Sequence, residues 1–444
     1  MATTTRPVAI LGGTRTPFCR SNTAYQDETN LSLLGCAMNG LVENHDLKGQ
    51  EIGEVVGGAV VTHAKDWNIA REVVVGTKLN PRTPATTMMQ ACGTSLQALM
   101  GSAAKIAIGQ IDSAIAMGSD SVSDAPVVFK RKFAQRLVKL SKAKSVKEKL
   151  GVFKGFSFGE LAPQPPGVNE PRTGLSMGQH CELMAQTWQI SREEQDKLAF
   201  DSHKKAAAAY QEGYHDDLIV PCAGIYQDNN LRADIDLDKI STLRTAFEKS
   251  NRGTLTAANS TPLTDGASTA LLSSEDWAKE NGHTVKALLV DAETAALDFV
   301  AGEGLLMAPT LAVARLLKRQ NMTLQDFDYY EIHEAFAAQV LCTLKAWQDE
   351  TYCRETLGLD APLGAIDLAK LNVKGSSLAY GHPFAATGAR IVSLLAKILS
   401  EKPGSTGLIS ICTAGGMGVA AILKSPGENA EKPQESPTSE FSEA

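Results

Sequence analysis

Two stretches decide the fold of this chain: Gly93-Thr94-Ser95-Leu96-Gln97-Ala98-Leu99 and Ala386-Thr387-Gly388-Ala389-Arg390-Ile391-Val392. Each stretch leads a predicted helix. A short apolar strand follows each helix, Ala114 to Met117 in the first case and Leu408 to Ile411 in the second, and both strands run into glycines. The unit of helix, strand and glycine turn therefore occurs twice, which predicts two duplicated halves.

Strands alternate with helices along most of the chain, which is typical of an α/β protein. Besides the two strands above, apolar runs predict strands at Ile52 to Val61, Val285 to Val290 and Tyr329 to Ile332. Helical spacing predicts helices at Ser95 to Ile108, Thr310 to Lys318 and Ala386 to Leu399. With 444 residues, the chain has room for two or three domains.

The stretch 127–250 interrupts this alternation and is predicted to be an inserted lobe. Its first part, 130–154, contains ten lysines or arginines and one acidic residue. The spacing of Phe133, Leu137 and Leu140 predicts a basic amphipathic helix in this part. Three interpretations of this part stay open from its residues: a solvated helix, contact with an anionic membrane surface, and contact with an acidic partner.

Composition excludes several classes of protein. Hydrophobic residues make up 43% and charged residues 21% of the chain, as in a soluble globular enzyme. The net charge of −7 argues against nucleic-acid binding. No apolar run approaches the roughly 20 residues that a membrane span needs. The first seven residues do not resemble a signal peptide, so we expect a cytoplasmic protein.

The cysteines and the last residues give two further expectations. The eight cysteines are scattered and form no CxxC pair, which predicts reduced thiols rather than a disulfide framework or a zinc site. Residues 425–444 contain five glutamates and one lysine and are predicted to form a disordered acidic tail.

Four residues lie in settings that suit covalent acyl transfer. Cys92 is placed at the predicted first turn of a helix, where the helix dipole favours a nucleophilic thiolate. His382 lies in a fixed turn between glycine and proline, as a general base requires. Cys412 offers a second thiol, and the backbone N–H groups of the glycine turn after it can form an oxyanion hole. His333 follows a predicted strand, where α/β sheets place their sites.

Each of these residues also has a structural interpretation: an inert buried cysteine, a hydrogen-bonded structural histidine, or a turn that merely needs glycine. Their occurrence together favours catalysis through a thiolate with a second thiol for proton transfer.

The motifs of this chain resemble those of the thiolase family over nearly its whole length. The matching motifs are Arg15-Thr16-Pro17-Phe18, the segment around Cys92, Met177-Gly178, Ser191 to Asp196, Thr254 to Asn259, Asp265-Gly266-Ala267, His333-Glu334-Ala335-Phe336, Gly381-His382-Pro383 and Cys412. His333 replaces the asparagine of most members. Together with the segment Ala379 to Gly388 and the basic insert, it resembles the branch of thiolase β-subunits in trifunctional fatty-acid oxidation complexes.

The resemblance implies a five-layered α/β/α/β/α fold from two similar halves with an inserted loop domain. The expected N-terminal half is 1–126, completed by 251–280, the inserted domain is 127–250, and the C-terminal half is 281–424. The resemblance also implies a homodimer or tetramer, a hydratase/dehydrogenase partner subunit, and contact of 130–154 with a membrane or partner. Binding of the CoA phosphates is a further interpretation of 130–154. No metal and no cofactor are implied, because CoA is a substrate.

The implied activity is that of a 3-ketoacyl-CoA thiolase in fatty-acid β-oxidation. His382 would take the proton from Cys92, whose thiolate would attack the 3-keto carbon, and Cys412 would protonate the departing acetyl-CoA enolate. His333 and His382 would donate to the thioester or enolate oxygen. The N–H groups of Cys92 and Ala414 would hold the oxyanion of acyl transfer.

Substrate binding is implied for Met177, Ala257 and Thr261. The chain departs from the commonest pattern at three places: Ala414 replaces glycine, Thr261 replaces serine, and Lys374-Gly375-Ser376-Ser377 replaces a more usual Gly-Gly pair.

Three alternatives remain. A biosynthetic acetoacetyl-CoA thiolase uses the same chemistry on a short substrate. Ketoacyl synthases share the fold and a nucleophilic cysteine but lack a counterpart of Cys412 in a Cys-x-x-Gly-Gly turn. A lipid-binding relative without activity would need neither a nucleophile nor two proton-transfer groups.

Overall fold

One mixed β-sheet organises the computed structural model, which describes residues 5–164 and 166–427. From one edge to the other, its strands are β10 (Tyr329–Ile332), β11 (Thr406–Thr413), β12 (Met417–Lys424), β9 (Ala287–Ala296), β1 (Val8–Arg15), β8 (Thr264–Ser274), β5 (Ser113–Asp120), β3 (Glu54–Gly58) and β4 (Ala85–Thr87). The short β2 (Cys19–Arg20) pairs with β8 outside this order.

The sheet has two related halves. β3 and β5 pair in parallel, and β5 then pairs antiparallel with β8. In the other half β10 and β11 pair in parallel, and β11 pairs antiparallel with β12. The halves meet where Val8 to Ile10 of β1 pair with Ala287 to Leu289 of β9. This order confirms that the fold is duplicated.

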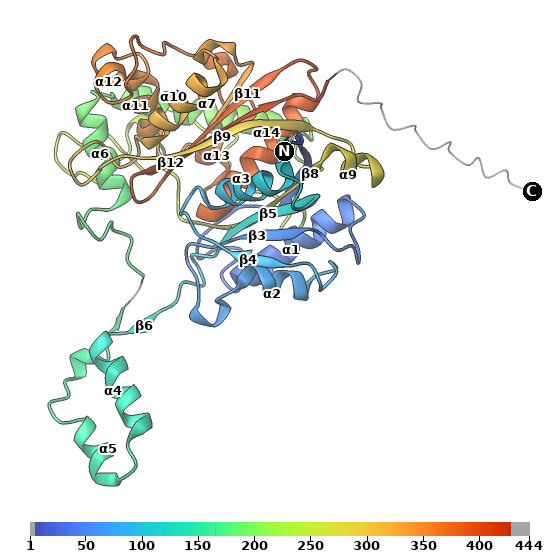
Figure 1. The fold of residues 1–444 in the computed structure, drawn as a ribbon. Coiled ribbons are helices and arrows are strands. Elements are labelled where there is room, and N and C mark those ends of the chain that lie inside the picture. Colours follow the sequence, from blue (N-terminus) through green and yellow to red (C-terminus); the bar gives the residue numbers. More distant parts are fainter. Residues whose placement is uncertain (1–4, 165, 428–444) are drawn as a thin grey trace, which may run out of the picture.

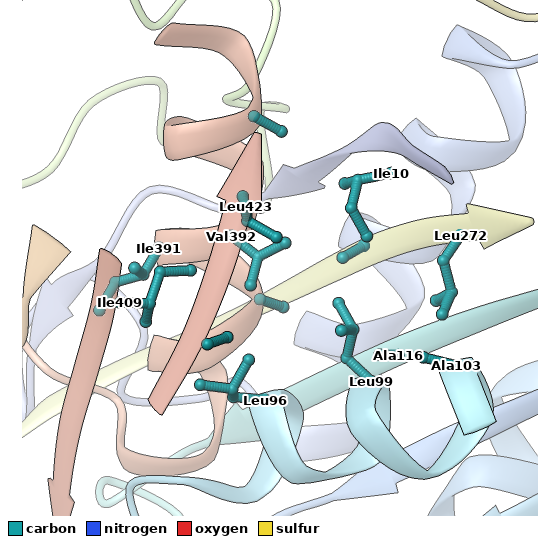
Figure 2. Close-up of a cluster of buried hydrophobic side chains, with 14 of the residues drawn as sticks. Ile10, Leu96, Leu99, Ala103, Ala116, Leu272, Ile391, Val392, Ile409 and Leu423 are labelled. Carbon is teal, nitrogen blue, oxygen red and sulfur yellow. The ribbon is translucent and has the colours of Figure 1, made fainter. Parts of the chain in front are cut away.

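Helices form three further layers (Figure 1). α3 (Thr94–Ala107) and α14 (Thr387–Ser400) lie against each other between the two halves and share one buried apolar cluster with strands from both (Figure 2). α1 (Asn30–Asn44) and α2 (Ile69–Gly76) cover the outer face of the first half. α10 (Ala308–Gln320) and α11 (Ala337–Ala346) cover that of the second. The two halves of the sheet pack on the central helices from either side and form two strand layers, which together with the three helix layers confirm the five-layered α/β/α/β/α prediction.

The two central helices approach closely at Gly388. A Cβ atom added there would lie 2.4 Å from the backbone nitrogen of Leu96 and 2.9 Å from Ser95 Oγ. Ser95 Oγ in turn accepts a hydrogen bond of 2.8 Å from the backbone N–H of Ala389. A residue without a side chain thus lets the start of α14 lie directly on the start of α3.

Several elements between β5 and β8 lie outside the large sheet. α6 (Met177–Thr187) packs on α11, and α7 (Arg192–Gln211) packs on α11 and α13 (Ser377–Tyr380). The same region contains β6 (Val128–Phe129), β7 (Pro163–Gln164), α8 (Leu237–Ser241), the 3₁₀ turn Phe158–Glu160 and the helices of the basic segment. Elsewhere the chain adds α9 (Glu275–Glu280), α12 (Glu350–Glu355) and 3₁₀ turns at Ala64–Asp66, Leu324–Asp326, Leu368–Lys370 and Phe384–Ala386.

The basic segment forms a helical hairpin that projects from the body of the protein (Figure 1). The predicted amphipathic helix is confirmed as α4 (Arg131–Lys142), which contains Phe133, Leu137 and Leu140, but a second helix that was not predicted, α5 (Val146–Val152), follows it. α4 ends at Lys142, and Ser145 caps α5 through a reciprocal pair of hydrogen bonds with Glu148.

The cysteine prediction was wrong for one pair. Cys36 and Cys222 form a disulfide although 186 residues separate them. α1 and the loop at 222 bring their Cα atoms to 5.8 Å, within the range that a disulfide bridges, and sequence spacing cannot reveal such a contact. The other six cysteines are free.

Two sequence predictions concern membranes and the tail. Among the described residues, no helix is long and apolar enough to cross a membrane. The predicted acidic tail, 425–444, lies outside the described residues from position 428 onward.

Candidate active site

Cys92 lies in a tight turn just before α3, not in its first turn as predicted. The turn passes through Ala91, whose φ is 46°, and α3 begins at Thr94 with Gly93 as its N-cap. Thr94 Oγ1 closes the turn by accepting from the N–H of Gln90 at 2.8 Å and donating to the carbonyl of Ala91 at 2.7 Å. This geometry holds the thiol at the helix end while leaving it partly exposed.

Gly93 lets this turn lie against the other half of the molecule. A Cβ atom there would lie 2.8 Å from Val419 Cγ2 and 2.9 Å from Thr413 Cγ2, on the two strands that flank the second glycine turn. The absence of a side chain therefore allows Cys92 to approach the segment that contains Cys412.

His382 is held in hydrogen-bonding contact with Cys92. Its Nε2 lies 3.0 Å from Cys92 Sγ, and its Nδ1 lies 2.6 Å from Thr387 Oγ1. Its backbone N–H donates to Thr264 Oγ1 at 3.1 Å, and Gly381 before it has a φ of 105°. Both ring nitrogens thus have partners, and the ring is fixed from two sides.

The Cys92–His382 pair is neutral in the free protein. Burial raises the pKa of the Cys92 thiol to about 12, and burial followed by the charge of Arg390 lowers the pKa of His382 to about 3. Desolvation of the Cys92 thiol therefore outweighs the helix dipole, and the thiolate forms only when His382 takes the proton. Proton transfer from thiol to imidazole must accompany the attack on substrate.

The backbone N–H groups of Ala414 and Cys92 itself act on the same thiol. Hydrogen bonding by both groups lowers the pKa of Cys92 and so opposes part of the effect of burial. The two donors therefore lie beside the nucleophile, and holding an oxyanion there is the role expected for them.

Cys412 lies at the end of β11 and is buried. Burial raises its thiol pKa well above the ordinary value, with a further contribution from Cys92. The thiol therefore keeps its proton at neutral pH, which suits a proton donor. In the glycine turn that follows, the N–H of Gly415 donates to Glu170 Oε1 at 2.8 Å.

His333 follows β10 and is fully buried. Its Nδ1 lies 2.9 Å from Ser377 Oγ, whereas its Nε2 has no hydrogen-bond partner among the described residues. The His333 and His382 rings have centroids 4.2 Å apart. One ring nitrogen of each histidine and Cys92 Sγ lie within 4.8 Å of one another. Burial, His382 and Arg390 lower the pKa of His333 well below its ordinary value, so its ring is neutral.

The three predicted substrate-binding residues lie on segments near these groups. Thr261 donates from both its N–H and its Oγ1 to the carbonyl of Ala335 at 3.0 Å, two residues beyond His333. Met177 begins α6 and packs against the apolar cluster that contains Cys412 and Phe336. Ala257 is exposed on the loop between Thr254 and Asn259.

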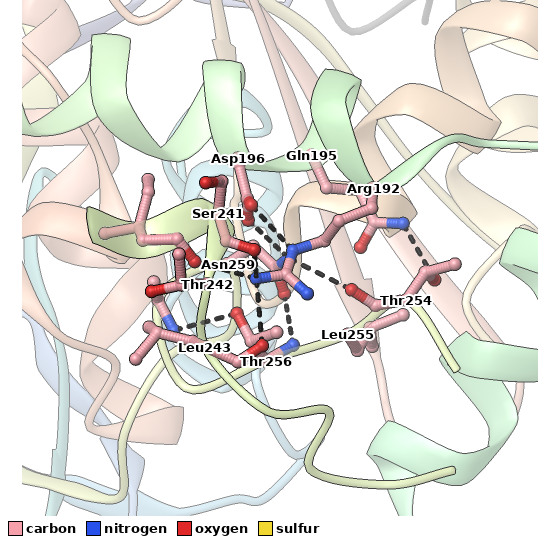
Figure 3. Close-up of polar contacts among 12 residues, drawn as sticks. Arg192, Gln195, Asp196, Ser241, Thr242, Leu243, Thr254, Leu255, Thr256 and Asn259 are labelled. Atoms are coloured by element: carbon pink, nitrogen blue, oxygen red, sulfur yellow. Dashed lines mark hydrogen bonds and ion pairs between the residues drawn. The ribbon is translucent and has the colours of Figure 1, made fainter. Parts of the chain in front are cut away.

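A buried polar network fixes that loop (Figure 3). The carboxylate of Asp196 accepts from Arg192 Nε at 2.6 Å and from Asn259 Nδ2 at 2.9 Å. Glu182 accepts from the N–H and hydroxyl of Thr254, both at 2.7 Å. α6 and α7 therefore hold the backbone that presents Ala257.

Sequence reasoning missed several groups that hold the site in place. Thr387 and Ser377 contact the two histidines, and Asp120 Oδ2 accepts from the N–H of Ala385 at 2.9 Å, which fixes the turn after His382. Glu170 holds the second glycine turn. Thr387 belongs to a quoted motif, but hydroxyl and carboxyl residues at such positions have no local signature of their partners.

A duplicated α/β fold with a nucleophilic cysteine, a paired histidine and a second buried thiol defines an acyltransferase of the cysteine type. The chain belongs to the thiolase family: the thiolase N-terminal domain matches residues 8–276 and the thiolase C-terminal domain matches residues 283–425.

Individual relatives are similar over nearly the whole chain. A 3-ketoacyl-CoA thiolase of Alteromonas mediterranea is 42% identical over 94% of this chain and 96% of its own length. Among solved structures, the acetyl-CoA acetyltransferase of Bacillus anthracis has a TM-score of 0.80 at 27% identity, covering 96% of this chain and all of that one. Human mitochondrial 3-ketoacyl-CoA thiolase has a TM-score of 0.77 at 25% identity, covering 95% of this chain and 99% of that one.

Proposed function

We propose that this thiolase cleaves 3-ketoacyl-CoA with CoA, giving acetyl-CoA and an acyl-CoA two carbons shorter, as in fatty-acid β-oxidation. The observation that carries the proposal is the 3.0 Å contact between Cys92 Sγ and His382 Nε2 beside the buried thiol of Cys412. The 42% identity to a 3-ketoacyl-CoA thiolase supports the choice of substrate.

The first half-reaction forms an acyl-enzyme. His382 Nε2 takes the proton of the Cys92 thiol as sulfur attacks the 3-keto carbon, and Thr387 Oγ1 accepts the Nδ1–H of the resulting imidazolium. We expect the backbone N–H groups of Cys92 and Ala414 to hold the new oxyanion. The C2–C3 bond then breaks, the acyl group stays on Cys92, and the electron pair goes to an acetyl-CoA enolate.

The second half-reaction completes the transfer. Cys412 gives its proton to C2 of the enolate, whose oxygen accepts hydrogen bonds from His333 and His382. The thiol of free CoA gives its proton to the Cys412 thiolate and attacks the acyl-enzyme. Cys92 leaves as thiolate and takes back the proton that His382 holds, which restores the free enzyme. In this scheme CoA is a substrate, and we propose that neither a metal nor a cofactor takes part.

The test is thiolysis of acetoacetyl-CoA and of 3-ketohexadecanoyl-CoA by the purified chain. We expect a higher kcat/KM on the long substrate and loss of activity in Cys92→Ser. Cys412→Ser should retain acyl transfer to Cys92, detected as a mass increase of the protein, while exchange of the C2 protons of acetyl-CoA with solvent falls at least about 100-fold. A preference for acetoacetyl-CoA would assign the biosynthetic function instead.

We also propose that the hairpin of α4 and α5 binds an anionic membrane surface. Apolar side chains are exposed on it, including Val146 at 74% and Leu150 at 71%, and they lie among the ten basic residues of 130–154. A basic face beside exposed apolar groups suits the boundary between charged headgroups and acyl chains.

Sedimentation with vesicles tests the membrane proposal. We expect binding to phosphatidylglycerol vesicles, weak binding to phosphatidylcholine vesicles, and loss of binding in Leu150→Glu. Leu368→Glu is the matched control, because Leu368 is also exposed, at 59%, but lies outside the hairpin. Equal binding by both variants would contradict the proposal. If the wild type fails to bind vesicles but captures a hydratase/dehydrogenase subunit through the hairpin, the surface serves a protein partner.

The homodimer or tetramer, the partner subunit and the cytoplasmic location also stay predictions. Six free cysteines suit a reducing compartment, and the Cys36–Cys222 disulfide runs against it.

A further inference from the structure

Ser377 lies between a buried cation and one histidine of the site. Its Oγ is 2.9 Å from His333 Nδ1 and 2.8 Å from Arg390 Nη2. All three residues are buried, with Ser377 and His333 fully inaccessible to solvent. Ser377 is the first residue of α13, and it belongs to the segment where the chain departs from the commonest pattern of its family.

The hydrogen positions in the contacts from Arg390 through Ser377 to His333 follow from which of these groups can donate and which can accept. An arginine only donates, so Ser377 Oγ accepts from Arg390. Among the described residues, the one acceptor within reach of the serine hydroxyl hydrogen is His333 Nδ1. If Nδ1 carried the hydrogen instead, the buried hydroxyl of Ser377 would be left without an acceptor, which is costly.

The assignment leaves a free donor at the other side of the ring. A neutral imidazole whose Nδ1 accepts must carry its hydrogen on Nε2. His333 Nε2 is the buried atom without a partner. Its hydrogen is therefore available to an incoming substrate oxygen.

The position of Ser377 relative to His333 is fixed by Glu334, the next residue along the chain. Its carboxylate accepts from Ser202 Oγ and from Asn372 Nδ2, both at 2.7 Å, and from the N–H of Leu378 at 3.2 Å. The residue after His333 and the residue after Ser377 are thus bonded to each other. Because they move together, the 2.9 Å contact does not depend on either loop alone.

We infer that Ser377 is a positioning residue that holds His333 as the Nε2–H tautomer, so that His333 acts as a hydrogen-bond donor to the substrate oxygen and never as a base. The inference rests on the proposed function. It divides the work between two neighbouring histidines: His382 exchanges protons with Cys92, and His333 only donates.

The experiment compares Ser377→Ala with Ser376→Ala in the full chain. Ser376 Oγ also lies near Arg390, at 3.4 Å from both terminal nitrogens, but it does not contact His333. Thiolysis of 3-ketohexadecanoyl-CoA gives kcat and KM, and nitrogen-15 NMR of histidine-labelled protein reports which ring nitrogen of His333 carries the hydrogen. The His333 signals are identified by their loss in His333→Asn.

We expect kcat of Ser377→Ala to fall about 10- to 100-fold while KM stays within about threefold of the wild-type value. The Nδ1–H tautomer of His333 has no hydrogen on Nε2 and therefore cannot donate to the substrate oxygen in the transition state. The NMR spectrum should show Nε2–H in the wild type and a loss of that preference in Ser377→Ala. Ser376→Ala should keep kcat within about threefold and the wild-type tautomer, and Ser377→Thr, which keeps a hydroxyl, should recover most of the activity.

Two results would overturn the inference: an Nδ1–H tautomer in the wild type, or a Ser377→Ala variant with unchanged kcat and tautomer. Absence of wild-type thiolysis would instead contradict the proposed function. The NMR result would still decide the tautomer in that case, so the two failures are distinguishable.

Discussion

Gly388→Ala should loosen the contact on which both the core and the active site depend. The added Cβ would lie 2.4 Å from Leu96 N, and ordinary contact begins at 3.4 Å, so α3 and α14 must separate by about 1 Å there. The atom that must give way is backbone, which cannot rotate aside. Overpacking of this kind destabilises the fold by about 1–3 kcal/mol. Replacing a glycine inside a helix by alanine offsets about 1 kcal/mol of this cost, because alanine has the higher helix propensity.

We expect Gly388→Ala to lower the free energy of unfolding by up to about 2 kcal/mol. The same shift moves Cys92, before α3, relative to His382, before α14, and a 1 Å error between reacting groups reduces kcat by about 100-fold. Gly101→Ala is the matched control, because Gly101 lies in α3 with nothing within 4 Å of its added Cβ. It should gain about 0.5–1 kcal/mol and keep its activity.

Urea unfolding followed by circular dichroism, together with thiolysis kinetics, measures both effects. The reasoning is refuted if Gly388→Ala is as stable as Gly101→Ala and retains wild-type kcat. A loss of kcat without loss of stability would show that the helices adjust at little cost while the catalytic distance does not.

Three further predictions follow from buried groups. Thr387→Val removes the acceptor of the His382 Nδ1–H and should lower kcat about 10- to 100-fold, whereas unchanged kinetics would contradict its role. Burial lowers the pKa of His215 and His382 to about 3 from 6.5, so the unfolded state binds more protons below pH 6.5. The free energy of unfolding in urea should therefore fall by up to about 2 kcal/mol per histidine between pH 7.5 and 5. The fall should be smaller in His215→Gln, and a rise in stability over this pH range would contradict the reasoning. Thiol titration in guanidinium should find six thiols without reductant and eight with it, since Cys36 and Cys222 are paired; eight in both would contradict the disulfide.

The sequence alone was sufficient for much of the fold. The strand at Tyr329 to Ile332 was predicted with its observed bounds, and the central helices within a residue of theirs, because helical and strand periodicity are local properties. The hairpin was predicted only in part, since the apolar spacing of Phe133, Leu137 and Leu140 lies within α4 and gives no sign of the second helix.

The same contrast holds for the site. Cys92, His382, Cys412 and His333 could be predicted because each lies in a motif whose residue types and spacing are chemically distinctive. Tertiary structure alone decided their protonation, since desolvation raises the pKa of Cys92 and lowers that of His382.

Contacts between distant segments could likewise not be predicted from the sequence. Cys36 and Cys222 are 186 residues apart, and Ser377 reaches His333 across 44 residues. The sequence determined which elements form and which residues carry the chemistry, because these depend on near neighbours in the chain. The tertiary structure determined partners, burial and charge states, because these depend on which surfaces the fold removes from water.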